Sequence, residues 1–244
     1  MNFFAIDSSN QLTLSSADIH HIISVLRARA GDIINVVEPK TQSLNECQIT
    51  NVSKNNIEFK VISKTPITTE PPAKIVLFQC IPKSQKMELI IPPCVELGVS
   101  KIVPVVSKFV VPNASFAAKK QERWQTIAEA SAKQSRRGII PRITQPITFE
   151  QAIEQLKPMD ICLMPYENPT ESSEKIDQVM AKQNIQNIKS IGILIGSEGG
   201  FAPQEADLAL ANDVNIVTLG SRILRTQTAG AVAITLVMSA LGEM

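Results

Sequence analysis

From residue 74 onward, short runs of β-branched and other apolar residues alternate with longer stretches of mixed polarity. The apolar runs, at 75–80, 101–106, 161–164, 191–195 and 216–219, are typical of strands buried on both faces of a sheet. The stretches between them predict helices, the longest over 116–137 with Gly138 as the left-handed residue that ends it. This alternation predicts an α/β fold with a mostly parallel sheet covered by helices on both faces.

The chain before residue 66 carries a different pattern. Short apolar runs at 3–6, 33–37, 46–52 and 57–62 predict a small β-rich module. Ser15 and Asp18 have the spacing of a helix N-cap, and an apolar helix face should follow, formed by Ile19, Ile22, Ile23 and Leu26. Other residues of this segment should point outward or lie at the helix end: His20, His21, Arg27 and Arg29.

A stretch with three prolines, residues 66–72, separates these two patterns. Proline lacks a backbone N–H and favours extended linkers, so we expect domains at 1–70 and 74–244. The last predicted helix, over 229–241, is apolar on every side and too short to span a bilayer. We expect it to be buried partly in the core and partly in a subunit interface, as in a homodimer.

Two Gly-rich motifs follow the last two predicted strands. Residues 195–201 read Ile-Gly-Ser-Glu-Gly-Gly-Phe, and residues 219–226 read Leu-Gly-Ser-Arg-Ile-Leu-Arg-Thr. In open α/β sheets, ligands bind where loops leave the carboxyl ends of strands. Two such motifs on adjacent strands therefore predict one shared cavity for a small molecule, in which Gly199 and Gly200 permit close backbone approach.

The net charge of +1 conceals an uneven distribution. Residues 74–142 hold twelve Lys and Arg against four Asp and Glu, whereas residues 143–244 hold six against twelve. Residues 1–73 are nearly balanced, with six against seven. The basic middle segment indicates a face for a polyanion, with an ordinary solvated helix surface as the alternative.

The remaining composition argues against several classes of site. The cysteines, Cys47, Cys80, Cys94 and Cys162, are far apart, so we expect reduced, buried thiols in a cytoplasmic protein. With only two histidines, adjacent in sequence, no metal site is expected. No apolar run approaches the roughly 20 residues that span a bilayer, and no signal peptide is recognised.

Familiar phosphate and nucleophile motifs are also missing from the sequence. It has no Gly-x-x-x-x-Gly-Lys loop and no Gly-x-Gly-x-x-Gly opening a βαβ unit, and Ser197 does not lie in Gly-x-Ser-x-Gly. The sequence does offer a Gly-rich cavity and a basic middle segment, but it has few side chains that could act as titratable catalysts. These features predict a group transfer in which a bound cofactor supplies the reactive atom and the protein positions it.

The order and spacing of several segments, residues 21–32, 83–88, 96–99, 129–141, 195–201 and 219–225, are specific in combination. On these segments the chain resembles the ribosomal RNA small-subunit methyltransferase E family, the 16S rRNA (uracil-N3)-methyltransferases of the SPOUT superfamily. The resemblance implies an N-terminal PUA-like β-barrel and a C-terminal α/β domain with a deep trefoil knot, an exception to the rule against knots. It also implies S-adenosylmethionine bound in the knot, a homodimer, and 16S rRNA of the small ribosomal subunit as substrate.

The resemblance assigns roles to individual residues. S-adenosylmethionine would be held by the two Gly-rich turns and the end of the preceding strand, through Leu163, Met164, Pro165, Ile195, Gly196, Glu198, Gly199, Gly200, Leu219, Gly220, Ile223, Leu224 and Thr228. Arg225 is the candidate for stabilising an anionic uracil, with a phosphate contact or a salt bridge to Glu198 as alternatives. RNA contacts are implied for Arg27, Arg29, Lys83, Lys86, Lys108, Arg136, Arg137 and Arg222.

The chain departs from the family pattern at a few positions. Gln227, the second candidate catalytic residue, stands where relatives usually carry Glu, and an amide cannot act as a base. Lys108-Phe109 replace a common Glu-Arg pair, and Pro92-Pro93 should break or kink their helix. Two alternatives stay open: a SPOUT methyltransferase acting on another RNA, such as tRNA ribose O-methylation, and a catalytically silent RNA-binding assembly factor.

Overall fold

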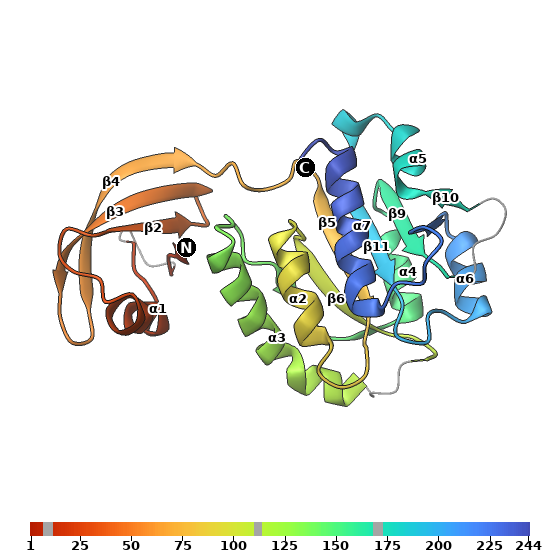
Figure 1. Cartoon of the computed structure of the whole chain (residues 1–244), viewed down its shortest axis with the longest axis horizontal. Coiled ribbons are helices and arrows are strands. Elements are labelled where there is room, and N and C mark those ends of the chain that lie inside the picture. The colour runs from red at the N-terminus through yellow and green to blue at the C-terminus, as the bar shows by residue number, and fades with distance from the viewer. Residues whose placement is uncertain (7–11, 110–113, 168–172) are drawn as a thin grey trace. The chain divides into compact units, whose positions relative to one another are not determined.

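The computed structural model describes residues 1–6, 12–109, 114–167 and 173–244. These residues form two compact units, each with its own core (Figure 1). The first unit comprises residues 1–70 together with 132–140, and the second comprises 71–131 and 141–244.

The first unit is built on a four-stranded sheet of β1 (Asn2–Phe4), β2 (Ile33–Glu38), β3 (Ser43–Val52) and β4 (Ile57–Pro66), in that order. The first pair of strands is parallel and the other two pairs are antiparallel. Its core contains Phe3, Ile22, Val36 and Ile49, which are almost completely buried. The predicted β-rich module is therefore present, and its strands cover three of the four predicted apolar runs in full, while β1 ends at Phe4 and covers only part of the run 3–6.

The predicted N-terminal helix forms but changes its winding. The Ser15 Oγ accepts a hydrogen bond from the Asp18 N–H at 3.0 Å and caps α1 (Ser16–His20), as predicted. The chain then continues as a π-helical turn, η1 (His21–Val25), whose wider winding shifts the side-chain positions. As a result Leu26, predicted on the inner face, is 49% exposed, whereas Ile22 is fully buried.

The long helix α3 (Ala114–Gln134) ends differently from the prediction. Arg136, not Gly138, adopts the left-handed conformation, with φ +60°, and the Arg137 N–H bonds to the Ala132 carbonyl across it at 3.0 Å. Gly138 serves close packing instead, because a Cβ there would lie 2.2 Å from Cγ2 of Ile67. The prediction that Gly138 ends the helix in a left-handed conformation is therefore wrong.

The second unit is a parallel sheet, as predicted, with strand order β10-β12-β9-β11-β5-β6-β7 and β8 paired to β6. The strands are β5 (Lys74–Cys80), β6 (Lys101–Val106), β7 (Arg142–Ile143), β8 (Ile147–Thr148), β9 (Ile161–Pro165), β10 (Glu174–Lys175), β11 (Ser190–Ile195) and β12 (Asn215–Thr218). The two strands that carry the Gly-rich motifs are not direct neighbours, which corrects the prediction, because β9 lies between β11 and β12.

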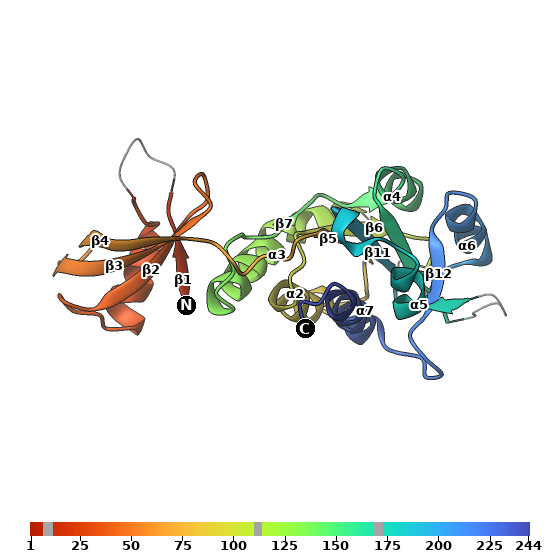
Figure 2. The ribbon, with the colours of Figure 1, turned by 90° about the horizontal axis from the view of Figure 1, so that it is seen from above.

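Helices cover both faces of this sheet. Figure 2 shows three helices on one face, α2 (Met87–Glu96), α5 (Ile176–Ala181) and α7 (Thr226–Ala240). The other face carries α4 (Phe149–Leu156), and α6 (Pro203–Leu210) lies beside β12. A short 3-10 turn, η2 (Ile185–Asn187), follows α5. Pro203 begins α6, where the missing backbone N–H of proline costs no helical hydrogen bond. Of the two effects predicted for Pro92-Pro93, a break does not occur, since α2 continues through both residues, and a kink stays a prediction.

The burial of α7 agrees in part with the expectation for an all-round apolar helix. Gly230, Ala233, Ile234 and Val237 are buried in the core, as predicted, but Leu236 is 38% exposed. The prediction of buried thiols is confirmed for all four cysteines, which are free. Burial raises the pKa of Cys80 and of Cys94 to about 12.

Candidate functional site

The carboxyl ends of three neighbouring strands surround one cavity of about 320 Å³. The end of β9 contributes Pro165, Tyr166 and Glu167, and both Gly-rich turns contribute residues on either side. The structure therefore places the two turns around a single cavity, as the sequence predicts. Its size lies within the roughly 300–1,000 Å³ of small-molecule sites.

The first turn, after β11, is held by a close approach of two glycines. Gly200 adopts φ +65° and its N–H bonds to the Ser197 carbonyl at 3.0 Å. A Cβ on Gly196 would lie 3.0 Å from the Cα of Gly200, a tight contact that would force the Gly200 backbone to shift by a few tenths of an ångström. The turn therefore depends on glycine at both positions, and it exposes backbone groups to the cavity.

The second turn, after β12, passes through Gly220 at φ +106°. The Thr218 Oγ1 accepts a hydrogen bond from the Gly220 N–H at 3.1 Å, which fixes the start of the turn. Ile223 and Leu224 then line the cavity, and Ile223 is 82% exposed. An apolar side chain this exposed beside a cavity is suited to covering a ligand.

The two turns are joined beneath the cavity by buried polar groups. The Thr226 hydroxyl, in the first turn of α7, donates to the Gly196 carbonyl at 2.6 Å. Gln79, at 0% exposure in β5, donates through its Nε2 to the Thr226 Oγ1 at 3.0 Å. Gln79 and Thr226 thus tie both turns to the centre of the sheet.

A polar cluster lies beside the first turn. The Glu198 carboxylate accepts hydrogen bonds from the Lys83 N–H at 3.0 Å and from the Lys86 Nζ at 2.7 Å. Partial burial raises the pKa of Glu198, but the hydrogen bonds from Lys86 and from backbone N–H groups outweigh this, so the net pKa is lowered. This carboxylate fixes the loop after β5 against the loop after β11.

The residues assigned to the cofactor lie at and around the cavity. Those that line it are Pro165, Ile195, Gly196, Gly200, Leu219, Gly220, Ile223 and Leu224. Leu163 and Met164 are fully buried within the sheet, and Gly199 packs against the Phe109 side chain. Glu198 and the exposed Thr228 are likewise absent from the lining.

The two candidate catalytic residues flank the cavity wall. Arg225 is exposed and precedes the first residue of α7, and its carbonyl accepts hydrogen bonds from the N–H groups of Thr228 and Ala229. Gln227 is half-buried in the first turn of the same helix. Thr226, between them, lines the cavity, whereas neither candidate does.

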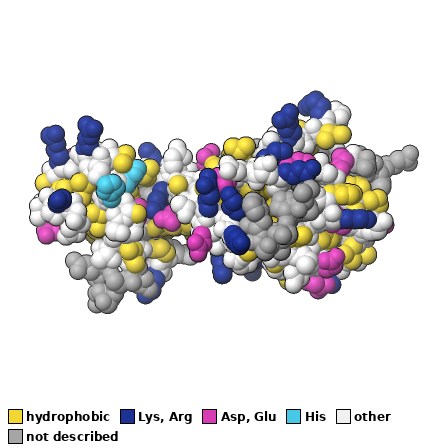
Figure 3. Space-filling view, turned by 90° about the horizontal axis from the view of Figure 1, so that it is seen from below, with side chains coloured by type: hydrophobic (Ala, Val, Ile, Leu, Met, Phe, Trp, Pro, Cys, Tyr) yellow, Lys and Arg dark blue, Asp and Glu magenta, His cyan; other side chains and the backbone are white. Residues whose placement is uncertain are grey.

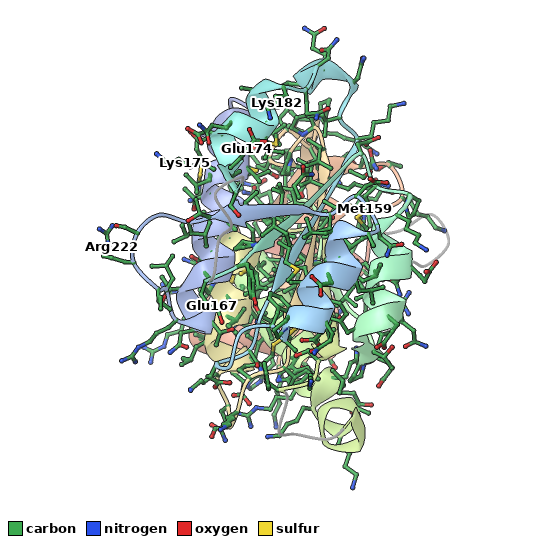
Figure 4. The ribbon with its side chains drawn as sticks, turned by 90° about the vertical axis from the view of Figure 1, so that its right-hand side faces the viewer. Met159, Glu167, Glu174, Lys175, Lys182 and Arg222 are labelled. Carbon is green, nitrogen blue, oxygen red and sulfur yellow. The ribbon has the colours of Figure 1, made fainter. Side chains whose placement is uncertain are left out.

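Sequence reasoning missed part of the lining, namely Tyr166, Glu167, Ser197, Phe201, Thr218, Ser221, Thr226 and Ala229, and it assigned Arg222 to RNA. Tyr166 and Glu167 are the two residues after β9, and their position at a strand end is the signal in the sequence that predicts contact with a ligand. Figure 4 shows Arg222 at the tip of the loop after β12, pointing away from the rest of the unit, whereas Glu167 lies closer in.

The residues assigned to RNA belong to both units. Arg27, Arg29 and Arg136 are exposed in the first unit, and Lys108 and Arg222 are exposed in the second. Figure 3 shows, on the face that it draws, Lys and Arg side chains in several separate groups with other side chains between them. Arg27 and Arg136 both have left-handed backbones, with φ +53° and +60°.

Arg137 must be withdrawn from the RNA contacts. It is 3% exposed, and its guanidinium pairs with the Glu70 carboxylate. The same carboxylate accepts the Gly138 N–H at 2.7 Å. A buried, paired guanidinium cannot reach a phosphate, so Arg137 stabilises the first unit.

Two further properties of the described ranges bear on function. Their His, Cys, Asp and Glu side chains form no group of three or more that could hold a metal ion. None of their helices has the length and apolar character needed to cross a membrane.

The comparisons with known proteins agree with this geometry. Residues 69–238 match the model of an RNA methyltransferase domain, and residues 14–62 match that of an RNA methyltransferase PUA domain. Among curated proteins, the ribosomal RNA small subunit methyltransferase E of Mesomycoplasma hyopneumoniae is 33% identical over 93% of both chains. The protein of the same name from Bacillus subtilis is 30% identical over 92% of this chain and 88% of its own.

A solved structure is similar over the same length. It is the ribosomal RNA small subunit methyltransferase E of Neisseria gonorrhoeae bound to S-adenosyl methionine, with a TM-score of 0.83 and 27% identity over 98% of this chain and 96% of that one. On these matches and on the two units that it forms, the chain belongs to the ribosomal RNA small subunit methyltransferase E family.

Proposed function

We propose that this protein transfers the methyl group of S-adenosylmethionine to N3 of a specific uracil in the 16S rRNA of the small ribosomal subunit. The observation that carries the proposal is a cavity enclosed by two Gly-rich turns at the carboxyl ends of parallel strands, in a chain that belongs to this family over nearly its whole length. The same membership favours this function over methylation of another RNA.

The lining residues fit S-adenosylmethionine in size and chemistry. Backbone groups of Ile195, Gly196 and Leu219 would bind the adenine and ribose edges, and the apolar side chains of Ile223 and Leu224 would cover them. Gly200 and Gly220 keep the cavity walls free of side chains at two points. Glu198 would act indirectly, by holding the first turn in place through its contacts with Lys83 and Lys86.

When bound, the donor supplies a methyl group on a positively charged sulfur, which a nucleophile attacks in line. The work left to the protein is to align the uracil with that methyl group, which can lower the barrier by roughly 7–11 kcal/mol. Arg225 precedes α7, beside the cavity, where its guanidinium would stabilise negative charge on the uracil oxygens. Gln227 would hydrogen-bond the substrate rather than take its proton.

RNA binding is assigned to exposed cations in both units. The exposed ones are Arg27, Arg29, Lys83, Lys108, Arg136 and Arg222, and the half-buried Lys86, which also pairs with Glu198, is assigned with them. They would contact phosphates and orient the rRNA, leaving recognition of the base to the cavity.

The finer features of the fold belong to the same proposal. We expect the sheet of the first unit to be part of a PUA-like β-barrel, and the second unit to carry a deep trefoil knot. Two exposed leucines, Leu89 on α2 and Leu236 on α7, support a homodimer through these two helices, which contact each other. We place the protein in the cytoplasm, where ribosomal subunits assemble, and we assign it no metal.

The direct test uses ribosomes from cells that lack the gene, with mass mapping of the small-subunit rRNA. Loss of one uridine methylation, restored by the gene in trans, is the expected result, and an unchanged methylation pattern would refute the proposal. Purified protein assayed side by side on small subunits and on tRNA separates the RNA substrates. Donor binding without turnover on either, with activity gained by Gln227→Glu, would instead identify a silent assembly factor.

A further inference from the structure

Glu167 is a carboxylate in the cavity that neither the fold nor the proposed methyl transfer accounts for. It is the second residue after β9 and lines the cavity, facing the first Gly-rich turn. The side chain lies against Gly200, since a Cβ on that glycine would be 1.9 Å from the Glu167 Oε1 and 2.5 Å from the Oε2. The absence of a side chain at Gly200 is therefore what admits the carboxylate to this position.

Other carboxylates near the cavity are held by hydrogen bonds within the fold, whereas the described part of the chain supplies no such partner to Glu167. Glu198 is bound by Lys83 and Lys86. Glu205 accepts hydrogen bonds from the Ala202 N–H and the Lys108 N–H, both at 2.8 Å. Among the described residues, no hydrogen bond or ion pair engages the Glu167 carboxylate.

The charge of Glu167 restricts what the cavity can accept. Of the described residues, Glu167 and Arg222 are the charged side chains that line it, and Arg222 points outward at the tip of its loop (Figure 4). A carboxylate at the wall repels RNA phosphates and attracts a cation. A ligand that fits this wall therefore carries positive charge close to its Glu167-facing end.

We propose that Glu167 pairs with the positive charge on the methionine end of the methyl donor, carried by its sulfonium or its α-ammonium group. The inference rests on the proposed use of S-adenosylmethionine and extends it to this residue. A carboxylate–cation contact of this kind is strong when the ligand itself covers it from water. Glu167 would then be a specificity residue for the charged donor, outside the set of residues that hold adenine and ribose.

Two variants isolate the charge. Glu167→Gln removes it with little change in shape. Glu174→Gln is the matched control, because Glu174 lies on β10 in the same sheet, outside the cavity lining, where it pairs with Lys182 at 2.5 Å (Figure 4). Isothermal titration calorimetry of the full-length protein would use three ligands: S-adenosylmethionine, S-adenosylhomocysteine, which lacks the sulfonium charge, and 5′-methylthioadenosine, which lacks the amino acid as well.

The expected result is a rise in the Kd for S-adenosylmethionine of about tenfold or more in Glu167→Gln, with 5′-methylthioadenosine binding unchanged and Glu174→Gln like the wild type. If S-adenosylhomocysteine is also unaffected, the partner is the sulfonium, and if it weakens equally, the partner is the α-ammonium. Either pattern supports the proposal.

Two outcomes would overturn the inference. One is unchanged S-adenosylmethionine affinity in Glu167→Gln, even with lower turnover, since that would make the carboxylate a proton acceptor or an RNA contact. The other is an equal loss for all three ligands, which would indicate a change in the cavity itself. Failure of the wild-type protein to bind any of the three would refute the proposed function, a result distinct from both.

Discussion

The Thr226 Oγ1 lies 2.6 Å from the Gly196 carbonyl oxygen, and this hydrogen bond joins the start of α7 to the first Gly-rich turn. The same hydroxyl accepts the Gln79 Nε2–H at 3.0 Å, so one buried side chain connects a central strand to both walls of the cavity. A ligand between the turns would meet walls whose spacing is already fixed, which reduces the ordering that binding requires.

Replacing Thr226 with Val should destabilise the protein and weaken donor binding. Val keeps the shape but removes the hydroxyl that joins the Gln79 amide to the Gly196 carbonyl. The amide keeps its bonds to the carbonyls of Cys80 at 3.0 Å and Gly196 at 3.4 Å, so the expected cost is about 1 kcal/mol in unfolding free energy. Urea denaturation and calorimetry with S-adenosylmethionine measure the two effects. Thr226→Ser retains the hydroxyl and should restore both; a Val variant with normal stability and affinity would contradict this role.

The positive φ of Gly200 gives a second prediction. Gly200→Ala should cost about 1–2 kcal/mol in stability, because the left-handed backbone disfavours a Cβ. It should also displace the Glu167 carboxylate and raise the Kd for the donor. Gly31→Ala is the control, since Gly31 has φ +99° with no atom within 4 Å of the added Cβ. This variant should lose stability but bind the donor with the Kd of the wild type. Equal donor affinity in both variants would argue against the contact.

The strands of the second unit were predictable because their burial is uniform. The strand predicted over residues 101–106 forms β6 over the same span. A run of β-branched residues buried on both faces can be recognised from its own sequence, without knowledge of the neighbouring strands. The placement of both Gly-rich turns at one edge also followed from chain direction alone.

The remaining features depend on contacts between distant residues. Periodicity does not reveal that β9 separates β11 from β12, because strand order is decided by how the helices pack. The exchange of roles between Arg136 and Gly138 has the same origin: Ile67 occupies the space at Gly138, so the glycine is needed there while the helix ends at an arginine. The ion pair that buries Arg137 likewise joins it to Glu70, 67 residues away.

Adjacent arginines at the end of α3 should respond in opposite ways. Arg137→Met leaves Glu70 partly buried without its cation and should cost about 3 kcal/mol in unfolding free energy. Arg136→Gly should relieve the left-handed strain and stabilise the protein by up to about 1 kcal/mol, while weakening rRNA binding. Urea denaturation and the salt dependence of RNA affinity measure these effects. Similar changes in both variants would show that the two side chains share one role.

The hydrogen bonds to Glu198 predict a specific pH dependence of stability. Because its pKa in the folded protein lies below the ordinary value of 4.5, Glu198 stabilises the fold above that value, and the contribution is lost as the pH falls through the folded pKa. The pair with Lys86 is partly exposed, so we expect the contribution to be less than about 1 kcal/mol. Urea denaturation of the wild type and Glu198→Gln at about pH 7 and about pH 3.5 tests this. At the higher pH the wild type should be more stable than Glu198→Gln, and the difference in unfolding free energy between the two proteins should shrink at the lower pH. A difference that is the same at both pH values would mean that the Glu198 charge does not hold the loop after β5 against the first turn.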